Sequence, residues 1–559
     1  MRWRTAAARA VGAVREWGTA RSPDPSVSAE SFLGWRDLRL VPVAAAVWGG
    51  AAWAVIGPAA GLPLLSVAGW AGGVLAGALL AGVLLRVSPL KLAVLVAALA
   101  WAGGFGAGAA RLAHDTAGPA GLLLAEGGDA QVVLELLGEP RRQQSGGPYS
   151  SAPRYIAEAR LVAGTHDGLR FTGSARVVVA AVALDGLRRG DLIEAPARFE
   201  GGRSDGTGFL SLRGAPKRTG SSPQSHLTAG LREALRTQVS SLPPDAAGLL
   251  PALAVGDRSA LDPQLEADLR AAGLSHLTAV SGANFALVLG TVALVLRAAR
   301  LPRWAVGVTC GLTLLAFVAV VGPEASVLRA GAMGSVGLVA LFAGRSGTAC
   351  AALCSAVVGI LLIDPALALS YGFILSVLAT LGITLLGRPL AAALAPRLGQ
   401  WLAMVISVPL SAQLVCGPVV VLLDPVFQSW ALPANILAAP LVPPITIAAT
   451  LSLAVGMLCP PVAWLSAMAA GPPAVVLAGL AHGAAALPGS RLPWLEGIAG
   501  AIAMAVVSAV SAALVLLSTP GAALRALRRA FRPRRSPRRR ESTRGAPGKD
   551  RPPRPSGKQ

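Results

Sequence analysis

The chain has 559 residues, of which 54% are hydrophobic and 14% charged, and its formal net charge is +21. Apolar runs of helical length recur along it, which excludes an ordinary soluble domain and indicates a polytopic membrane protein. Its five cysteines lie in or at the edge of apolar runs, so they imply neither a disulfide framework nor a zinc site, and no cofactor is expected.

The positive charge is concentrated at one end of the chain. Residues 525–559 hold 14 basic and 2 acidic side chains, which gives +12, whereas residues 113–217 hold 12 of each sign. A positive-inside signal accounts for this excess without any nucleic acid. We expect residues 519–559 to form a basic, disordered cytoplasmic tail that is able to contact anionic lipid or nucleic acid.

The first part of the chain predicts three membrane spans. Residues 1–39 are too polar for a cleaved signal peptide and are expected to be a cytoplasmic N-terminal segment. Three transmembrane helices are expected within residues 40–112, at 40–57, 62–85 and 90–112. The basic loop 86–91 belongs on the cytoplasmic side, so the chain after residue 112 is expected outside.

Residues 113–217 are expected to form a small extracytoplasmic β domain. Five segments rich in Val, Ile and Phe lie between Gly-rich breaks, which predicts a small barrel with the OB-fold as the natural candidate, although other small β folds also fit. OB-folds often bind single strands through aromatics and basic grooves, but here aromatics are few and the charge is balanced. DNA binding and a structural or gating role therefore both stay open. The expected strands are 131–137, 155–162, 171–180, 191–199 and 209–212.

Residues 218–275 are expected to be a linker followed by amphipathic helices. A helix at 227–242 would place Arg232, Glu233 and Arg236 on its wet face and lie on the membrane surface. Asp262 followed by Pro263 marks a second helix start, because Asp accepts hydrogen bonds from free amides and Pro fits the first helical position. This short helix, with Gly273 as its C-cap, delivers the chain to the next span.

Residues 276–518 contain about nine further apolar segments, which brings the total to about twelve. Their loops alternate in charge, with arginines on one side and Glu324, Asp364, Asp424 and Glu496 on the other, as expected for cytoplasmic termini. The predicted fold is therefore a polytopic α-helical membrane protein of about twelve transmembrane helices. A small extracytoplasmic, OB-fold-like β-barrel is inserted between its two groups of spans.

Polar groups at membrane depth are the best pointers to function. His276, Ser281 and Asn284 are expected to form a broad polar band at the start of residues 276–518. Desolvating such groups costs several kcal/mol, so they normally face a helix bundle or a watery path. A Ser–His hydrolase is not favoured, because Ser281 and His276 point in different directions on one helix and no carboxylate orients them. No catalytic residue is predicted.

Arg329 is the leading candidate for a phosphate-facing residue, because it lies just inside an apolar segment; snorkelling to the nearby membrane edge is the alternative. Asp257 and Arg258 are expected to form a local structural pair or to line an entrance. The remaining candidates, for which hydrogen bonding between helices is the other role, are Tyr371, Gln413 and Asn435.

Four sequence blocks resemble the ComEC-type DNA-uptake channels of naturally transformable bacteria in order and spacing. They are GDRSALDPQLEADLRAAGLSHLTAVSG at 256–282, GPEASVLRAGAM at 322–333, DPALALSYGFILSVLATLGI at 364–383 and NILAAPLV at 435–442. The N-terminal arrangement is similar as well, so the resemblance covers most of residues 40–518. It implies that residues 276–518 are a competence-type channel domain, which passes single-stranded DNA inward across the cytoplasmic membrane during natural transformation.

Two departures from that family change the expectations. Family members commonly read Ser-Gly-Leu-His where this chain has Ser281, Gly282, Ala283 and Asn284, so a proton-linked role is not expected there. Many relatives carry a C-terminal metallo-β-lactamase-like domain, but this chain has no HxHxDH ligand cluster and is expected to lack that domain. Strand degradation would then need a separate nuclease.

The resemblance also implies partners. No GxxxxGK[ST] loop occurs, so the energy for import is expected from elsewhere. Besides lipid and single-stranded DNA, the implied partners are an extracytoplasmic DNA receptor and a cytoplasmic DNA-translocating ATPase. The sequence leaves open whether the channel is a single protomer or a homodimer.

Two other function classes stay open. Pro440, Pro443 and Pro444 predict a broken helix, which suits a pathway but equally a permease for a small polar solute. A permease often shows internal repeats, and none is found between the two groups of spans. The third class is a membrane anchor for a DNA-handling partner, which would not need a polar band.

Overall fold

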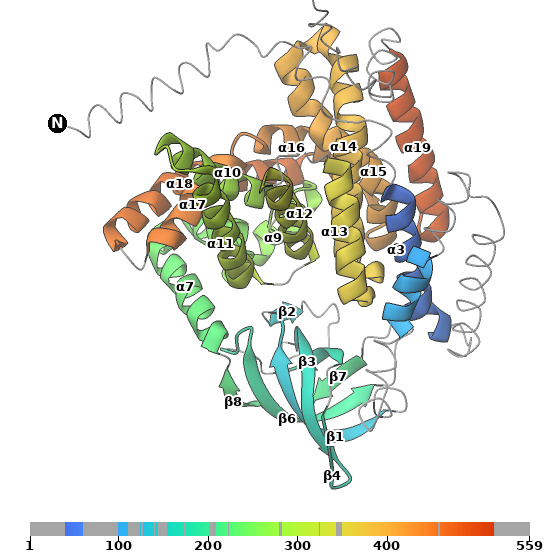
Figure 1. The fold of residues 1–559 in the computed structure, drawn as a ribbon, viewed down its shortest axis with the longest axis vertical. Coiled ribbons are helices and arrows are strands. Elements are labelled where there is room, and N and C mark those ends of the chain that lie inside the picture. The colour runs from blue at the N-terminus through green and yellow to red at the C-terminus, as the bar shows by residue number, and fades with distance from the viewer. Residues whose placement is uncertain are drawn as a thin grey trace, which may run out of the picture.

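The structure is a computed structural model that describes residues 40–59, 99–109, 123 and most of 127–518 (Figure 1). The gaps within the last range are 139, 144–153, 173–174, 183, 185, 201–207, 222, 279–281, 323–324, 343–348 and 457–458. The expected N-terminal segment 1–39, the expected span 62–85 and the expected tail 519–559 lie outside the described residues.

Five strands close into a barrel, as the Val-, Ile- and Phe-rich segments between Gly-rich breaks predict. The order is β1 to β3 to β5 to β7 to β6, and β6 pairs with β1 again; all pairs are antiparallel except β5 with β7. A closed five-stranded barrel of this kind fits an OB-fold. The strands are β1 (Gly128–Leu136), β3 (Arg154–His166), β5 (Arg176–Ala181), β6 (Asp191–Glu200) and β7 (Gly208–Leu212).

All five expected strands are present, and the third one needs a correction. The expected segment 171–180 is two strands, β4 (Leu169–Thr172) and β5, which pair with different stretches of β3. Two short strands outside the barrel order, β2 (Arg141–Gln143) and β8 (Lys217–Ser221), pair antiparallel with β3 and β6, respectively. Alternate residues of β1 and β6 point inward, so that side chains such as Val132, Leu134 and Ile193 fill the barrel.

Three short helices follow the barrel, α7 (Pro223–Val239), α8 (Pro244–Val255) and α9 (Pro263–Ala271). The amphipathic α7 is confirmed, but Arg232 is buried rather than on a wet face, because α7 packs on the helical bundle through Leu235 and Val239. The sequence reading missed α8 as a separate helix, since 12 apolar residues are too few to cross a membrane.

The start of α9 is confirmed as predicted. Asp262 is its N-cap and accepts hydrogen bonds from the backbone amides of Gln264 and Leu265. The helix ends at Ala271, and Gly273 then adopts a positive φ of 69°. A side chain at residue 273 would be strained and would also meet Ala431 of a neighbouring helix, which explains glycine at this turn.

The rest of the described chain is a helical bundle. Its helices are α10 (Gly282–Ala298), α11 (Arg303–Val321), α12 (Ala325–Phe342), α13 (Ala349–Ile363), α14 (Tyr371–Leu398), α15 (Gln400–Leu423), α16 (Ala431–Ala438), α17 (Val442–Val455), α18 (Pro460–Ala486) and α19 (Gly497–Leu517). The remaining elements are α3 (Val41–Ala59), the 3-10 turns η2 (Ser275–Leu277) and η3 (Pro365–Leu369), and the short strands β9 (Val426–Phe427) and β10 (Leu492–Pro493).

The described helices do not support the expected count of about twelve spans. Five are long and apolar enough to cross a membrane (α11, α14, α15, α18 and α19), and the pair α16 and α17, bent by 53° at a short break, makes a sixth. Other expected spans of the described chain form shorter apolar helices, including α10 and α13, so an apolar run alone overstated the number of spans. The bend lies at the prolines that predicted a broken helix.

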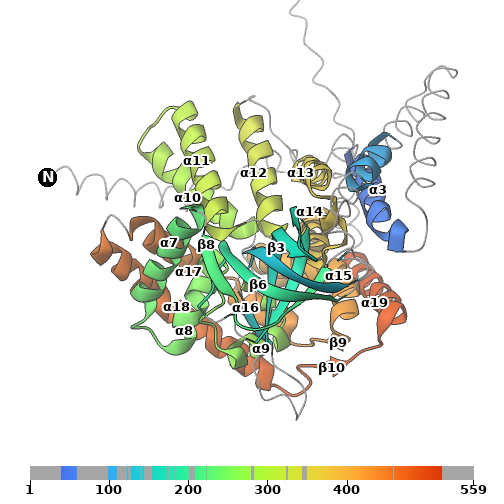
Figure 2. The ribbon, with the colours of Figure 1, turned by 90° about the horizontal axis from the view of Figure 1, so that it is seen from below.

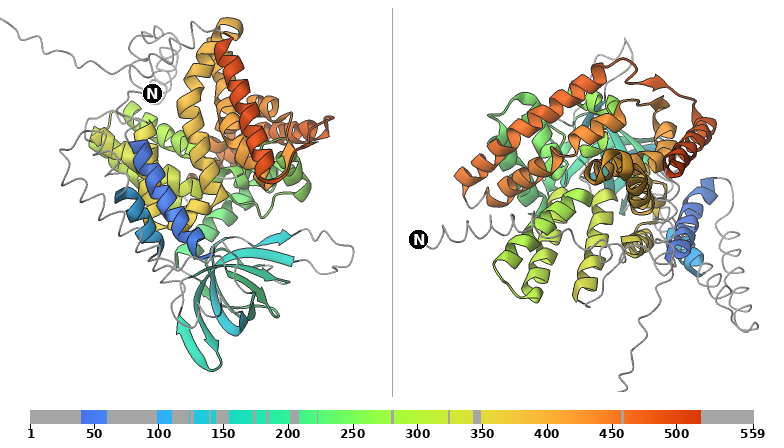
Figure 3. Two further views of the ribbon diagram at one scale, coloured as in Figure 1. Left: turned by 90° about the vertical axis from the view of Figure 1, so that its right-hand side faces the viewer. Right: turned by 90° about the horizontal axis from the view of Figure 1, so that it is seen from above.

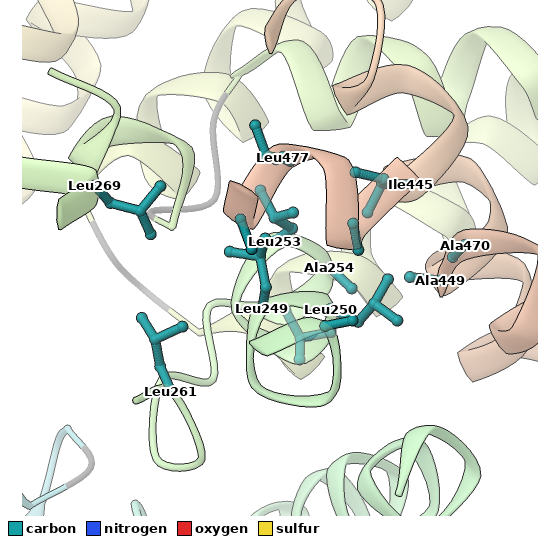
Figure 4. Packing of buried hydrophobic residues seen from close by; sticks show 14 of the residues in the cluster. Leu249, Leu250, Leu253, Ala254, Leu261, Leu269, Ile445, Ala449, Ala470 and Leu477 are labelled. Carbon is teal, nitrogen blue, oxygen red and sulfur yellow. The ribbon is translucent and has the colours of Figure 1, made fainter. Parts of the chain in front are cut away.

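The largest buried cluster lies where α8 meets α17 and α18. Leu249, Leu250 and Leu253 of α8 pack among Ile445 of α17 and Leu477 of α18 (Figure 4). The short α8 is thereby enclosed by protein along nearly its whole length. This burial explains why α8 carries apolar residues on all sides although it is too short to span a bilayer.

The helix α3 lies at the periphery of the bundle (Figure 3), where its Ala44, Val47 and Ala51 join the cluster formed with α13. It also packs closely on the helical residues 99–109: a Cβ on Gly50 would lie 2.1 Å from the Trp101 carbonyl oxygen. Such close approach of helix backbones through small residues is typical of membrane bundles.

Candidate functional site

The starts of three helices meet around Arg329. This residue lies in the second turn of α12, with its side chain 7% exposed, and its Nε donates to Ser376 Oγ of α14 at 2.7 Å. Its Nη1 lies 3.3 Å from Met333 Sδ. Gly282, the first residue of α10, is so close that a Cβ there would lie 3.0 Å from Nη2. Three of the four sequence blocks thus meet at one guanidinium.

The surroundings of Arg329 offer little negative charge. In the part of the chain that the structure describes, no carboxylate lies within ion-pair distance of the guanidinium, and the first turns of α10, α12 and α14 contain no acidic residue. Glu324, just before α12, is outside the described residues. Helix N-termini carry partial positive charge, so α10, α12 and α14 add to the positive potential of Arg329. This arrangement favours an anion.

His276 lies in η2, ahead of α10, and its side chain is exposed. Since α10 begins only at Gly282, His276 and Asn284 do not share one helix, and the expected single-helix polar band is wrong in this respect.

Side-chain hydrogen bonds hold the turn that carries His276 and the end of α9 before it. Arg258 Nε donates to the carbonyl oxygen of Thr278 at 3.1 Å. Gln428 Nε2 donates to Arg270 O of α9 at 2.8 Å, and Asn435 Nδ2 donates to Gly273 O at 3.3 Å. The turn is thereby tied to α16, one half of the bent helix pair.

Asn284 is buried, with 3% of its surface exposed, and its Nδ2 donates to Leu253 O at 2.9 Å. This carbonyl belongs to the last turn of α8, where helical carbonyls have no partner within their own helix. Asn284 thus joins α10 to α8. Ser281, predicted beside it, lies outside the described residues.

Asp257 has a different partner from the one expected. It is 1% exposed and pairs with Arg236 of α7, at 2.8 Å to Nε and 2.6 Å to Nη2, instead of with its neighbour Arg258. The backbone amide and the hydroxyl of Ser259 both donate to the other carboxylate oxygen of Asp257, Oδ1. Sequence proximity suggested the wrong pair, because the chain turns after α8 and brings Asp257 under α7.

Two further candidates, Tyr371 and Gln413, lie on α14 and α15. Tyr371 is exposed at the start of α14, and Gln413 is half-buried on α15. Asn435 contacts the His276 turn and also donates to Ala431 O of its own helix at 2.8 Å. Of the predicted pathway residues, the structure therefore groups His276 with Asn435, while Arg329 forms a second contact point beside Gly282.

Sequence reasoning missed several polar side chains that the fold brings together. His482 of α18 faces two carboxylates, Asp268 of α9 at 2.6 Å and Asp245 of α8 at 3.2 Å. Both ring nitrogens can donate only when the imidazole is doubly protonated, so this contact ties three helices through a charged histidine. No local spacing signals it, since the partners are more than 200 positions apart. Among the described residues, no group of His, Cys, Asp or Glu could hold a metal ion.

The fold and this cluster define a helical membrane protein with an inserted β-barrel domain. Residues 253–520 match the model of the competence protein family, described as "Competence protein", and all four sequence blocks lie within them. This match covers slightly less than half of the chain and confirms the resemblance to ComEC-type competence proteins.

The chain is also similar to ComE operon protein 3 of Bacillus subtilis (strain 168), with 26% identity over 201 residues. The aligned region is 36% of this chain and 25% of that protein, so the chain covers about a quarter of the relative's length. No solved structure matches the chain significantly.

Proposed function

We propose that this protein is a membrane channel that imports single-stranded DNA across the cytoplasmic membrane during natural transformation. The observation that carries the proposal is Arg329, a guanidinium buried among helix starts whose partners among the described residues are neutral, within a chain similar to competence proteins. A charged side chain at membrane depth is expensive and usually marks a substrate path.

The chemistry of the substrate fits such a residue. A polyanion needs positive potential along a hydrated path, but a dense cluster of cations would hold its phosphates too tightly for transport. Arg329 supplies one fixed charge. Ser376 accepts from Nε and sets the plane of the guanidinium, while the positive ends of α10, α12 and α14 add a diffuse field.

The other parts of the proposal follow from this path. The barrel fits an OB-fold, a fold that often contacts single strands, and a structural or gating role is its alternative. An extracytoplasmic DNA receptor would supply the strand, and a cytoplasmic DNA-translocating ATPase would supply the energy. A separate nuclease would remove the second strand.

The test is import of labelled DNA into a DNase-protected cytoplasmic pool in the native host. We expect import to be lost in a deletion strain and restored by the wild-type chain, but not by Arg329→Ala. Arg329→Lys keeps the positive charge but lacks the planar guanidinium, so it should restore import in part. The matched control is Arg303→Ala, which removes an exposed arginine at the start of α11.

The outcomes separate the alternatives, provided that membrane levels of the variants are equal. Undiminished import in the deletion strain would refute the channel proposal. Normal import with Arg329→Ala would remove this residue from the path.

The bent pair α16 and α17, joined through Asn435 to the His276 turn, favours a small-solute permease as the second candidate, because transporters place substrate sites at broken helices. A membrane anchor would tolerate every one of these substitutions.

A further inference from the structure

Two arginines bind the C-terminal end of α11. Arg189, on the connection between β5 and β6 of the barrel, donates from Nη1 to Val321 O at 2.8 Å. Arg232 of α7, which is 8% exposed, donates from Nη2 to Val320 O at 2.8 Å and to Val321 O at 3.1 Å. We call this arrangement the arginine clamp.

The clamp satisfies two requirements of a helix end. The last carbonyls of α11 have no partner within the helix, and the C-terminus carries partial negative charge, so a guanidinium binds there through charge-assisted hydrogen bonds. Beside the clamp, Arg188 forms an ion pair with Glu233 of α7 at 3.1 Å. The barrel is thus attached to both α7 and α11.

Gly322 gives room to the clamp. Its φ is +104°, and a Cβ at this position would lie 1.3 Å from Arg189 Nη1, so any side chain would displace the guanidinium. Gly322 opens the GPEASVLRAGAM block, and the chain continues from it into α12, where Arg329 lies in the second turn. The barrel therefore contacts the very turn that leads to the buried guanidinium.

The clamp holds the barrel across one face of the bundle. Figure 2, which views the molecule from the side of the barrel, shows the strands in front of the helices that surround α16. Arg189 reaches the α11 end from the connection between β5 and β6, whereas Arg232 reaches it from α7.

We propose that Arg189 is a positioning residue that docks the barrel on the turn between α11 and α12 and so aligns it with Arg329. The proposal rests on the proposed function for its consequence in DNA import, but the docking itself is independent of transport. Removing one charge-assisted hydrogen bond should raise the ratio of undocked to docked barrel about tenfold.

The experiment measures the distance between barrel and bundle in the full chain, reconstituted in lipid nanodiscs. Spin labels at Leu169→Cys, on the exposed tip of the β3–β4 hairpin, and at Ala267→Cys, on the exposed face of α9, report on it by pulsed electron paramagnetic resonance. The five native cysteines are first replaced by alanine. The wild-type clamp should give one narrow distance distribution.

The variants test each part of the clamp. Arg189→Ala should broaden the distribution while Arg232 still covers both carbonyls, so the fold is retained. Gly322→Ala should broaden it as well, because it expels the Arg189 side chain without removing it. Arg189→Lys, which keeps a cationic donor, should stay close to wild type. The matched control is Arg198→Ala, an exposed arginine of β6.

A distribution for Arg189→Ala that equals the wild-type distribution would overturn the proposal. In the import assay, Arg189→Ala and Gly322→Ala should lower uptake and Arg189→Lys should restore it, at equal membrane levels. If the wild-type chain imports no DNA, the channel proposal fails, whereas the distance measurement still decides whether Arg189 docks the barrel.

Discussion

Arg236 provides an internal comparison of buried and exposed ion pairs. The same guanidinium contacts Asp257, which is 1% exposed, at 2.6 Å, and Glu233, which is 51% exposed, at 3.4 Å. Asp257→Asn and Glu233→Gln each remove one negative charge with little change in shape. We expect Asp257→Asn to lower the free energy of unfolding far more than Glu233→Gln.

The magnitudes follow from burial. Removing one partner of a buried pair costs roughly 3–5 kcal/mol, because the other charge is left without compensation. Arg236 keeps 25% of its side-chain surface exposed and regains some hydration, so we expect about 2–4 kcal/mol for Asp257→Asn. The amide would still accept from Ser259 but would turn a donor toward Arg236. An exposed pair such as Glu233 with Arg236 contributes about 0–1 kcal/mol.

The assay is denaturant unfolding of the full chain in detergent micelles, followed by tryptophan fluorescence, with both variants measured at one protein concentration. Hydrogen exchange of the α7 and α8 amides should localise the loss to the contact between these helices. Equal destabilisation by the two substitutions would refute the argument from burial. A loss below about 1 kcal/mol for Asp257→Asn would show that Arg236 finds another partner or water.

Three further substitutions test contacts within the bundle, each by the same unfolding assay. Asn284→Leu leaves the buried Leu253 carbonyl without its donor and should cost about 1–3 kcal/mol, whereas no loss would mean that the carbonyl is hydrated. Asp262→Ala removes the N-cap of α9 and should cost about 1 kcal/mol, with faster amide exchange confined to its first turn. Gly382→Val should separate α14 from α15, because a Cβ at this position would lie 2.8 Å from Ser411 O; wild-type stability would contradict that close packing.

Local patterns predicted much of the fold. Segments rich in Val, Ile and Phe between Gly-rich breaks located the five barrel strands, although the third segment proved to be two strands. Asp262 and Pro263 located the start of α9, since capping depends on a few adjacent residues. The prolines at 440, 443 and 444 predicted the break between α16 and α17 for a similarly local reason.

Contacts between distant segments could not be predicted in this way. The amphipathic pattern of α7 placed Arg232 in water, because the pattern does not reveal that the end of α11 covers it. Asp257 was assigned to its sequence neighbour rather than to Arg236. The number of spans was overstated because an apolar run does not distinguish a spanning helix from a shorter apolar helix such as α13. For Arg232 and Asp257 the deciding contact is tertiary.

The arginines of this region differ in what neutralises them, and this difference bears on transport. Arg236 pairs with carboxylates, and Arg189 and Arg232 bind the negative C-terminal end of α11. The positive charge of each is therefore compensated by negative charge nearby. Among the described residues, Arg329 is held by a hydroxyl and a thioether, which fix its position without neutralising its charge. In the proposed channel this charge would act on the phosphates of a passing strand. A single fixed charge would attract each phosphate weakly enough to release it, as transport of a polyanion requires.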